Sequence, residues 1–354
     1  MHSLKKNFWN KKKVLITGHT GFKGRWLSVF LETLGARVHG LSIKSNNKKI
    51  FYTLLNKNYY CDIKNFNKLK KIVNRIQPEI IFHLAAQSLV LPGYKKVLDT
   101  YSTNFMGSVN LLEIAKYSKK TKAILITTTD KVYKNYKNNI EFNEKSELGG
   151  KDPYSASKAA LEVAIQSFIK ISSYREIKIA SLRAGNVIGG GDYAKNRIMT
   201  DLINFELKNK NKIEIRNPDS VRPWQYVLDV VSGYITLAEN LYKSEKFIGS
   251  YNFGPDQRLK KVKVKEVVEI FKNLTETNKN KIIFHKNNLS NSKEEKTIYL
   301  NNKKVRKILG VKNKITNPKE LISRSLGIYR ELSITNSKNI KNVYLKEINK
   351  YINE

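Results

Sequence analysis

The chain has 354 residues, 40% of them hydrophobic, which is enough for one large domain or two modest ones with a sizeable core. Its single cysteine, Cys61, excludes an intramolecular disulfide and fits a reducing compartment, and five scattered histidines add no metal-ligand pattern. The net charge of +36 comes from lysines spread along the chain without a basic stripe, so we expect compositional bias and no nucleic-acid partner.

No apolar run approaches the ~20 residues that a membrane-spanning helix needs. The segment 1–13 is polar and lacks the apolar stretch of a signal peptide. We therefore expect a cytoplasmic protein that binds no membrane and no metal.

From Lys13 onward, buried apolar runs alternate with helical patterns. Strands are expected at 14–18, 37–43, 79–86, 123–128 and 177–185. Helices are expected at 24–34, 66–76 and 103–118, from Tyr154, and at 199–208, 227–243 and 265–274. This alternation predicts an α/β fold of Rossmann type, a doubly wound parallel sheet with crossover helices.

After Gly191 the pattern becomes mixed, which predicts a smaller α/β substrate-binding region toward the C-terminus. We assign 12–190 to a dinucleotide-binding domain, with elements near 220–255 returning to it. Residues 191–332 form mainly the substrate region, and the polar segment 333–354 is expected to be a peripheral helix or a loose tail.

The sequence ITGHTGFKGRW places Gly18, Gly21 and Gly24 between a strand and a helix. The first glycine permits a tight turn, the second admits a pyrophosphate, and the third lets the helix approach the sheet. The free N–H groups at the N-terminus of the helix then face the phosphates. The alternative is a purely structural glycine turn. The strand–turn–helix context favours a dinucleotide site, which includes Thr20 and Phe22.

An NAD site usually has an acid after the second strand to hold the ribose diol. Here that strand is followed by Ser42, Lys44 and Ser45, and Lys44 suits a 2′-phosphate, so NADP remains an alternative to NAD. Asp62 is placed to contact the adenine end of the cofactor, or else it ends a turn or caps a helix.

Tyr154 and Lys158 are four residues apart on an expected helix and therefore share a face. An ammonium group near a phenol stabilises the phenolate, so we expect Lys158 to lower the pKa of Tyr154 toward the range of an acid–base catalyst. Taken alone the spacing is common, but it follows the glycine loop and the sequence TTTDK. That sequence places Thr129, Asp130 and Lys131 at a strand end, where they are either catalytic groups or polar loop residues.

Several motifs together resemble the extended short-chain dehydrogenase/reductase family: TGHTGFKG, HLAAQS, Asn104 in TNFMG, and YSASK. The Thr-Asp-x-Val-Tyr pattern at 129–133 is similar to that of sugar-nucleotide 4,6-dehydratases, and Lys131 at its variable position resembles the CDP-glucose 4,6-dehydratases. Further similar strings are GHTGFKGRWL, RAGNVIGGGDYA, IRNPDSVRPWQYVLD and YNFGP.

The resemblance implies an NAD-dependent conversion of CDP-glucose to a 4-keto-6-deoxy sugar, which would feed deoxysugar synthesis for surface polysaccharide. Tyr154 and Thr129 would act on the sugar 4-hydroxyl. Asp130 would be the acid for the departing 6-hydroxyl, and a neutral Lys131 would be the base at C5. Asp130 needs a pKa raised by burial for this role, and Lys131 one lowered by burial and by Lys158.

The resemblance also implies cofactor contacts at Ile63, Leu84, Ala85 and Ala86, and substrate contacts at Gln87 and Ser88. Asn186 follows a strand end, where ligands bind in such sheets. Arg197 and Arg222 are expected to bind the diphosphate, unless they are ordinary surface arginines.

Two alternatives remain open at this point. One is a sugar-nucleotide 4-epimerase or a dehydratase for another nucleotide, although epimerisation leaves no task for Asp130 and Lys131. The other is a non-catalytic NAD-fold protein that binds a polyanion through its charge, which the presence of Thr129, Tyr154 and Lys158 disfavours. The resemblance further implies a homodimer that pairs through helices like 106–116 and 154–169.

Overall fold

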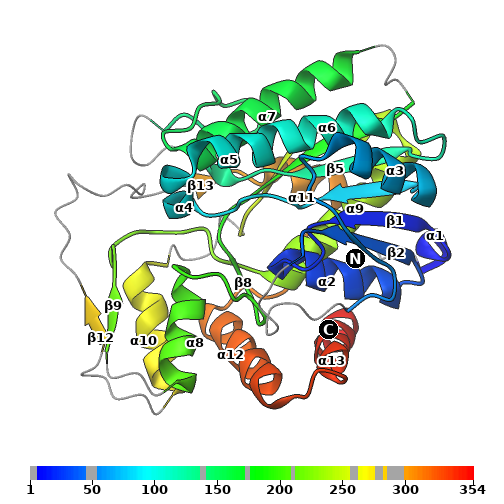
Figure 1. Ribbon diagram of the computed structural model, residues 1–354. Coiled ribbons are helices and arrows are strands. Elements are labelled where there is room, and N and C mark those ends of the chain that lie inside the picture. The colour runs from blue at the N-terminus through cyan, green and yellow to red at the C-terminus, as the bar shows by residue number, and fades with distance from the viewer. Residues whose placement is uncertain are drawn as a thin grey trace.

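The computed structural model describes residues 6–44, 54–135, 141–171, 176–208, 212–255, 262–275, 282–284 and 299–354. Within these ranges one sheet has the strand order β11-β7-β5-β4-β1-β2-β3, and each neighbouring pair is parallel (Figure 1). Its strands are β1 Lys13–Thr17, β2 Arg37–Ser42, β3 Asn58–Tyr60, β4 Ile80–His83, β5 Ala123–Thr127, β7 Lys178–Ala184 and β11 Gly249–Phe253. The predicted Rossmann-type sheet is confirmed.

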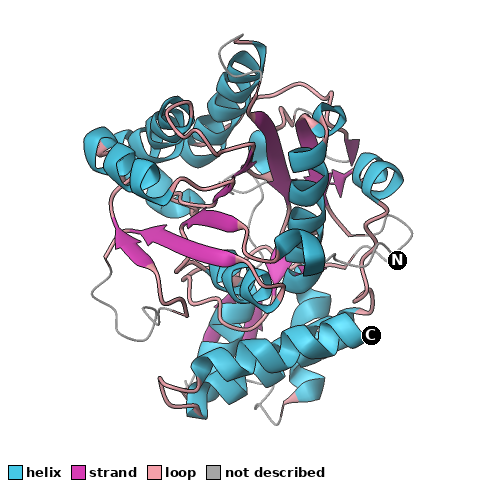
Figure 2. Cartoon of the chain, turned by 90° about the vertical axis from the view of Figure 1, so that its right-hand side faces the viewer, coloured by secondary structure: helices cyan, strands magenta, loops and turns pink. Residues whose placement is uncertain are grey.

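Helices cover both faces of this sheet (Figures 1 and 2). Along β1, Val14 and Ile16 belong to one buried apolar cluster and Leu15 to the other, as the two-residue period of a strand requires. One face carries α3 Phe66–Ile76, α6 Gly107–Ala115 and α7 Pro153–Lys170; the other carries α2 Phe22–Thr33 and α9 Val227–Lys243. None of the helices in the described ranges is long and apolar enough to cross a bilayer.

Short elements complete the chain beside the main sheet (Figure 1). Three pairs of short parallel strands are β6 Glu141–Phe142 with β13 Tyr299–Leu300, β8 Val187–Ile188 with β10 Gln225–Tyr226, and β9 Ile213–Ile215 with β12 Ile282–Phe284. The remaining helices are α1 Lys6–Trp9, α4 Val90–Lys95, α5 Val97–Tyr101, the π-helical turn η1 Ser102–Met106, the 3-10 turns η2 Asp130–Val132 and η4 Glu245–Phe247, α8 Ile198–Leu207, α10 Val264–Leu274, α11 Lys303–Leu309 and α12 Pro318–Ile334. The division into a cofactor domain and a substrate region stays a prediction.

The segment 333–354 contains the helix α13 Ile340–Asn353, which lies against α2. The rings of Tyr344 and Trp26 are 4.5 Å apart between centroids. The hydroxyl of Tyr351 donates to Asp229 of α9 across 2.9 Å. The last helix is therefore joined to the core beneath the sheet.

Candidate active site

The carboxyl ends of the parallel strands meet at one edge of the sheet, and a cavity of about 720 Å³ opens there. Loops after β1, β4, β5 and β7 contribute to its wall, as does the beginning of α7. Apart from Lys44 and Ser45 after the second strand, every residue named above as catalytic, cofactor-binding or substrate-binding lines this one cavity. Their shared location supports a common site, and their individual roles stay predictions.

The glycine loop has the backbone shape that a pyrophosphate requires. Gly18 has φ +72°, and a Cβ there would lie 2.7 Å from the backbone nitrogen of Ala85. A Cβ on Gly24 would lie 2.2 Å from the carbonyl oxygen of Gly18, so the helix approaches the strand as closely as backbone allows. At the N-cap, Gly21 makes no side-chain cap, and the first turn of α2 holds no acid. A helix N-terminus whose first turn carries no acid fits the diphosphate of a dinucleotide.

A chain of hydrogen bonds holds the opposite wall of the cavity. His83 Nδ1 is 2.7 Å from the hydroxyl of Thr17, and its Nε2 is 2.8 Å from that of Ser108. Burial lowers the pKa of His83 to about 3, so this histidine is a neutral structural link. Asn104 accepts from the backbone N–H of Gln87 at 2.8 Å and donates to its carbonyl at 2.9 Å. Asn104 thereby fixes the segment that carries the expected substrate contacts.

The part of the cavity next to β2, where the adenine of a dinucleotide is expected, contains no acid directly after that strand. The Oγ atom of Ser42 is buried there and has no hydrogen-bond partner among the described residues. Asp62 accepts from the backbone N–H of Lys64 at 2.9 Å, so it does terminate a turn while also lining the cavity. Ser45 lies outside the described residues.

Helix α7 places Tyr154 and Lys158 one turn apart in the cavity wall. The carboxylate of its N-cap, Asp152, accepts from the backbone N–H of Ser155 at 3.0 Å and so starts the helix just before Tyr154. The ammonium of Lys158 donates to the carbonyl of Thr127 at 2.9 Å. Burial lowers the pKa of Lys158 to about 7.

The predicted lowering of the Tyr154 pKa is wrong for this structure. Burial raises the pKa of Tyr154 to about 12, and a hydrogen bond with Thr129 opposes that rise only in part. The physical reason is that the desolvation cost of a buried phenolate exceeds the stabilisation from its neighbours.

The turn after β5 connects Tyr154 to the next acid in the chain. Thr129 shares a hydrogen bond with Tyr154 and donates from Oγ1 to Oδ1 of Asp130 at 3.0 Å. Burial raises the pKa of Asp130, as its proposed role as an acid requires. Its Oδ2 atom has no hydrogen-bond partner in the described part of the chain. Lys131 follows, half-buried and also in the cavity wall.

Three further expected substrate contacts, Asn186, Arg197 and Arg222, also line the cavity. Arg197 pairs with Asp192 at 2.8 Å between Nη1 and Oδ2, and Arg222 donates to the carbonyl of Val221 at 3.1 Å. Both guanidinium groups line the cavity, and their binding of the diphosphate stays a prediction. Asn186 lines the same region after β7.

Among the charged residues of the cavity that sequence reasoning missed are Lys23 and Asp192. Burial and the cationic Arg197 lower the pKa of Lys23 to about 8, while Asp130 and Asp192 oppose the shift. Both of these residues stand inside the strings GFKG and GGGDYA, where the glycines drew attention and the charged residues did not.

The comparisons with known proteins agree with this geometry. The family model described as GDP-mannose 4,6 dehydratase matches residues 15–324. A CDP-glucose 4,6-dehydratase of Salmonella typhimurium is 43% identical over 262 residues, which are 71% of this chain and 73% of that protein. A dTDP-D-glucose 4,6-dehydratase of Dictyostelium discoideum is 30% identical over 291 residues, covering 73% of this chain and 62% of that protein.

Among solved structures, a dTDP-glucose 4,6-dehydratase from Bacillus anthracis in complex with NAD has a TM-score of 0.75 at 21% identity, covering 94% of this chain and 99% of that one. A UDP-glucose 4-epimerase from Thermotoga maritima with UDP-glucose has a TM-score of 0.79 at 21% identity, covering 91% of this chain and 99% of that one. These two likenesses concern the fold. Because the family model matches most of the length of this chain, the chain belongs to the GDP-mannose 4,6 dehydratase family. This agrees with the extended short-chain dehydrogenase motifs in its sequence.

Proposed function

We propose that this protein is an NAD-dependent CDP-glucose 4,6-dehydratase, which converts CDP-glucose to CDP-4-keto-6-deoxyglucose and water. The observation that carries the proposal is the hydrogen-bonded series Tyr154–Thr129–Asp130, with Lys131 next to it in one cavity wall. Oxidation alone requires Thr129 and Tyr154, whereas removal of water also requires an acid and a base. The 43% identity to a CDP-glucose 4,6-dehydratase supports both the reaction and the nucleotide.

In the oxidation, Tyr154 takes the proton of the sugar 4-hydroxyl and Thr129 hydrogen-bonds the same oxygen. NAD held by the glycine loop after β1 would supply the reversible hydride acceptor that this oxidation needs. Lys158, one helical turn from Tyr154, keeps a positive charge close to the phenol when it is protonated.

In the elimination, the 4-ketone acidifies the C5 proton, which passes to the side-chain nitrogen of Lys131. Asp130 gives its proton to the departing 6-hydroxyl, so that water leaves and a C5–C6 double bond forms. The unpartnered Oδ2 atom of Asp130 is the oxygen available for this transfer. The hydride then returns to C6 while a proton returns to C5, which leaves the 4-ketone and a C6 methyl group.

The fit of the glycine loop to a pyrophosphate supports the dinucleotide, and Arg197 and Arg222 are the proposed contacts for the diphosphate of the sugar nucleotide. A homodimer is proposed as well. Its support is a set of exposed apolar side chains on α5, η1 and α7, namely Leu98 (84% exposed), Met106 (50%) and Val163 (58%).

The direct test incubates the purified protein and NAD, or NADP, separately with CDP-glucose, dTDP-glucose, UDP-glucose and GDP-mannose. Products are identified by mass and by the alkali-induced absorbance of 4-keto-6-deoxy sugars. Loss of one water from CDP-glucose alone, with NAD, is the expected result. Conversion without a change in mass would instead indicate epimerisation, and no conversion of any substrate would overturn the proposal.

A further inference from the structure

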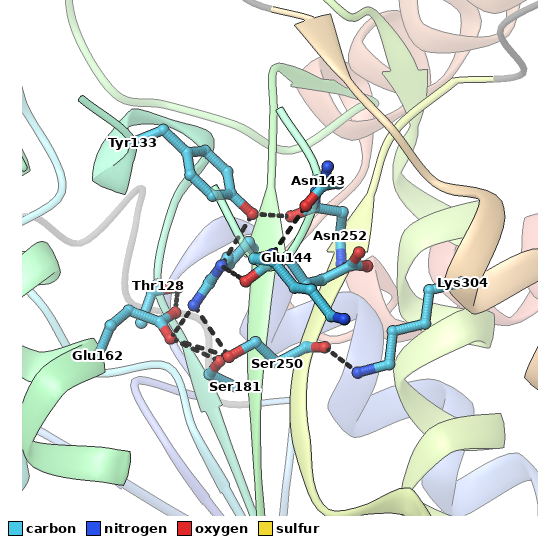
Figure 3. Close-up of polar contacts among 11 residues, drawn as sticks. Thr128, Tyr133, Asn143, Glu144, Glu162, Ser181, Ser250, Asn252 and Lys304 are labelled. Carbon is cyan, nitrogen blue, oxygen red and sulfur yellow. Dashed lines mark hydrogen bonds and ion pairs between the residues drawn. The ribbon is translucent and has the colours of Figure 1, made fainter. Parts of the chain in front are cut away.

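A fully buried ion pair lies directly behind the catalytic groups. Arg183 of β7 and Glu162 of α7 are 2.7 Å apart between Nη2 and Oε2, and their side chains are 1% and 0% exposed. Two serines complete the coordination of the carboxylate: Ser181 donates at 2.8 Å and Ser250 at 3.2 Å (Figure 3). The pair is therefore a built polar cluster inside the domain.

Both ends of the catalytic turn, residues 129–132, are tied to this ion pair. Before the turn, the hydroxyl of Thr128 donates to Oε1 of Glu162 at 2.5 Å. After the turn, Nη1 of Arg183 donates to the hydroxyl of Tyr133 at 2.9 Å. Figure 3 shows Tyr133 on one side of the cluster and Thr128 and Glu162 on the other. Thr129, Asp130 and Lys131 stand between these two attachment points.

One member of the ion pair, Glu162, lies on α7, the helix that carries the other catalytic groups. Glu162 follows Lys158 by four residues and Tyr154 by eight, so all three share one side of α7. The turn after β5 and the helix α7 thus have a common anchor. Any shift of that anchor changes the distance between Tyr154 and the acid–base groups of the turn.

Stability alone does not explain such a pair. The desolvation cost of two buried charges offsets most of their attraction, and well-packed apolar residues at such sites are often at least as stable. What a hydrogen-bonded ion pair supplies is a defined direction and distance for each partner. Here Glu162 binds the residue before the catalytic turn, Thr128, and Arg183 binds the residue after it, Tyr133.

We propose that Arg183 and Glu162 are positioning residues, which act through Thr128 and Tyr133 to hold the catalytic turn in register with Tyr154 and Lys158. This inference rests on the proposed dehydratase function. Thr129 directly follows the first attachment point, while Asp130 and Lys131 lead into the second, at Tyr133. Loosening the first attachment therefore impairs oxidation and elimination together, and loosening the second impairs mainly elimination.

The first variant is Thr128→Val, which removes the hydroxyl bound to Glu162 and keeps the size of the side chain. Its matched control is Thr121→Val, at the opposite end of β5, where a buried hydroxyl donates to the carbonyl of Pro78 at 2.7 Å. We expect kcat of Thr128→Val to fall by about 10- to 100-fold with KM little changed, because small misplacements of catalytic groups cost that much. Thr128→Ser, which keeps the hydroxyl, should restore the rate.

The second variant is Tyr133→Phe, with Tyr351→Phe as its control. The hydroxyl of Tyr351 is likewise hydrogen-bonded to a buried charged group, the carboxylate of Asp229, but Tyr351 lies in the last helix. With CDP-glucose, Tyr133→Phe should accumulate the absorbance of reduced nicotinamide, because oxidation continues and elimination slows. The control should turn over as the wild-type protein does.

Hydrogen exchange of the amides in residues 129–133 provides a readout that needs no substrate. It should be faster in Thr128→Val and Tyr133→Phe than in the two control variants. Equal exchange and equal kcat in variants and controls would overturn the inference and leave the ion pair a structural feature only. If the wild-type protein converts no sugar nucleotide, the proposed function fails, and the exchange rates alone decide whether these anchors hold the turn.

Discussion

The hydroxyl of Thr129 donates to the Oδ1 atom of Asp130 across 3.0 Å, and Tyr154 shares a hydrogen bond with the same threonine. The group proposed for the oxidation is therefore linked directly to the group proposed for the elimination. The ionisation of Tyr154 and that of Asp130 are therefore coupled through a single hydroxyl. The following substitutions separate the two halves of the reaction.

Asp130→Asn keeps the size of the side chain and removes its acidic proton. We expect oxidation of the sugar to continue and release of water to fall by about 10²- to 10⁴-fold, the usual contribution of a general acid. Mass analysis of the product measures the loss of water. Asp219→Asn, an exposed aspartate with a side chain 70% accessible, is the control and should retain full activity.

Lys131→Met removes the amine proposed as the base at C5. Exchange of the C5 hydrogen with solvent deuterium should disappear while reduced nicotinamide still forms. Lys134→Met is the matched control, because Lys134 lies three residues later and pairs with Glu147 at 2.7 Å. Full turnover by Lys131→Met would rule out its role as the base.

Gly24→Ala should abolish tight NAD binding, measured by calorimetry with the cofactor alone. The added Cβ would lie 2.2 Å from the carbonyl oxygen of Gly18, so the loop that receives the pyrophosphate must move. The control is Gly327→Ala in α12, where the added Cβ meets nothing within 4 Å. That control should bind NAD normally and raise the free energy of unfolding by ~0.5–1 kcal/mol, since alanine favours a helix over glycine.

Leu98→Asp tests the proposed dimer, because it places a charge on the exposed apolar side of α5. Sedimentation should shift from dimer to monomer. Ile334→Asp is the comparison, since Ile334 is 86% exposed at the end of α12, away from the proposed interface. A monomeric wild-type protein, or a Leu98→Asp variant that remains dimeric, would contradict the proposal.

Asp229 gives the stability of the fold a specific pH dependence. Burial raises the pKa of Asp229 from 3.8 to about 6, so the folded protein binds this proton more tightly than the unfolded chain does. The resulting stabilisation is present below pH 3.8 and is lost as the pH rises through about 6. Over that window the wild type should lose ~3 kcal/mol relative to Asp229→Asn, measured by denaturant unfolding at each pH. Parallel curves for the two proteins would contradict the shifted pKa.

The sheet was predictable because strands buried on both faces appear as continuous apolar runs separated by helical spacing. The residues at which the strands and helices begin and end were less predictable. The run 79–86 was expected to be strand throughout, but β4 ends at His83 because Leu84 to Ser88 form the cavity wall. The site positions were predictable for a related reason: motif residues at strand ends meet at one edge in a parallel sheet.

What the sequence could not show depends on tertiary burial. The raised pKa of Tyr154 results from the protein packed around it, which neighbouring letters do not reveal. Lys23 appeared as a spacer between glycines, although in the fold it lies close to Arg197, Asp130 and Asp192. The pairing of Glu162 with Arg183 joins a helix and a strand, and although Arg183 opens the string RAGNVIGGGDYA, nothing in the sequence indicates its partner.

The position of α13 also affects how the protein is made. Its ion pair between Lys341 and Glu32 joins residues 309 positions apart, and Tyr344 covers Trp26 of the second helix. A growing chain folds from its N-terminal end as it is synthesised. Here the first βα unit remains partly uncovered until α13 has been made, so the apolar surface around Trp26 is exposed while the intervening residues are synthesised.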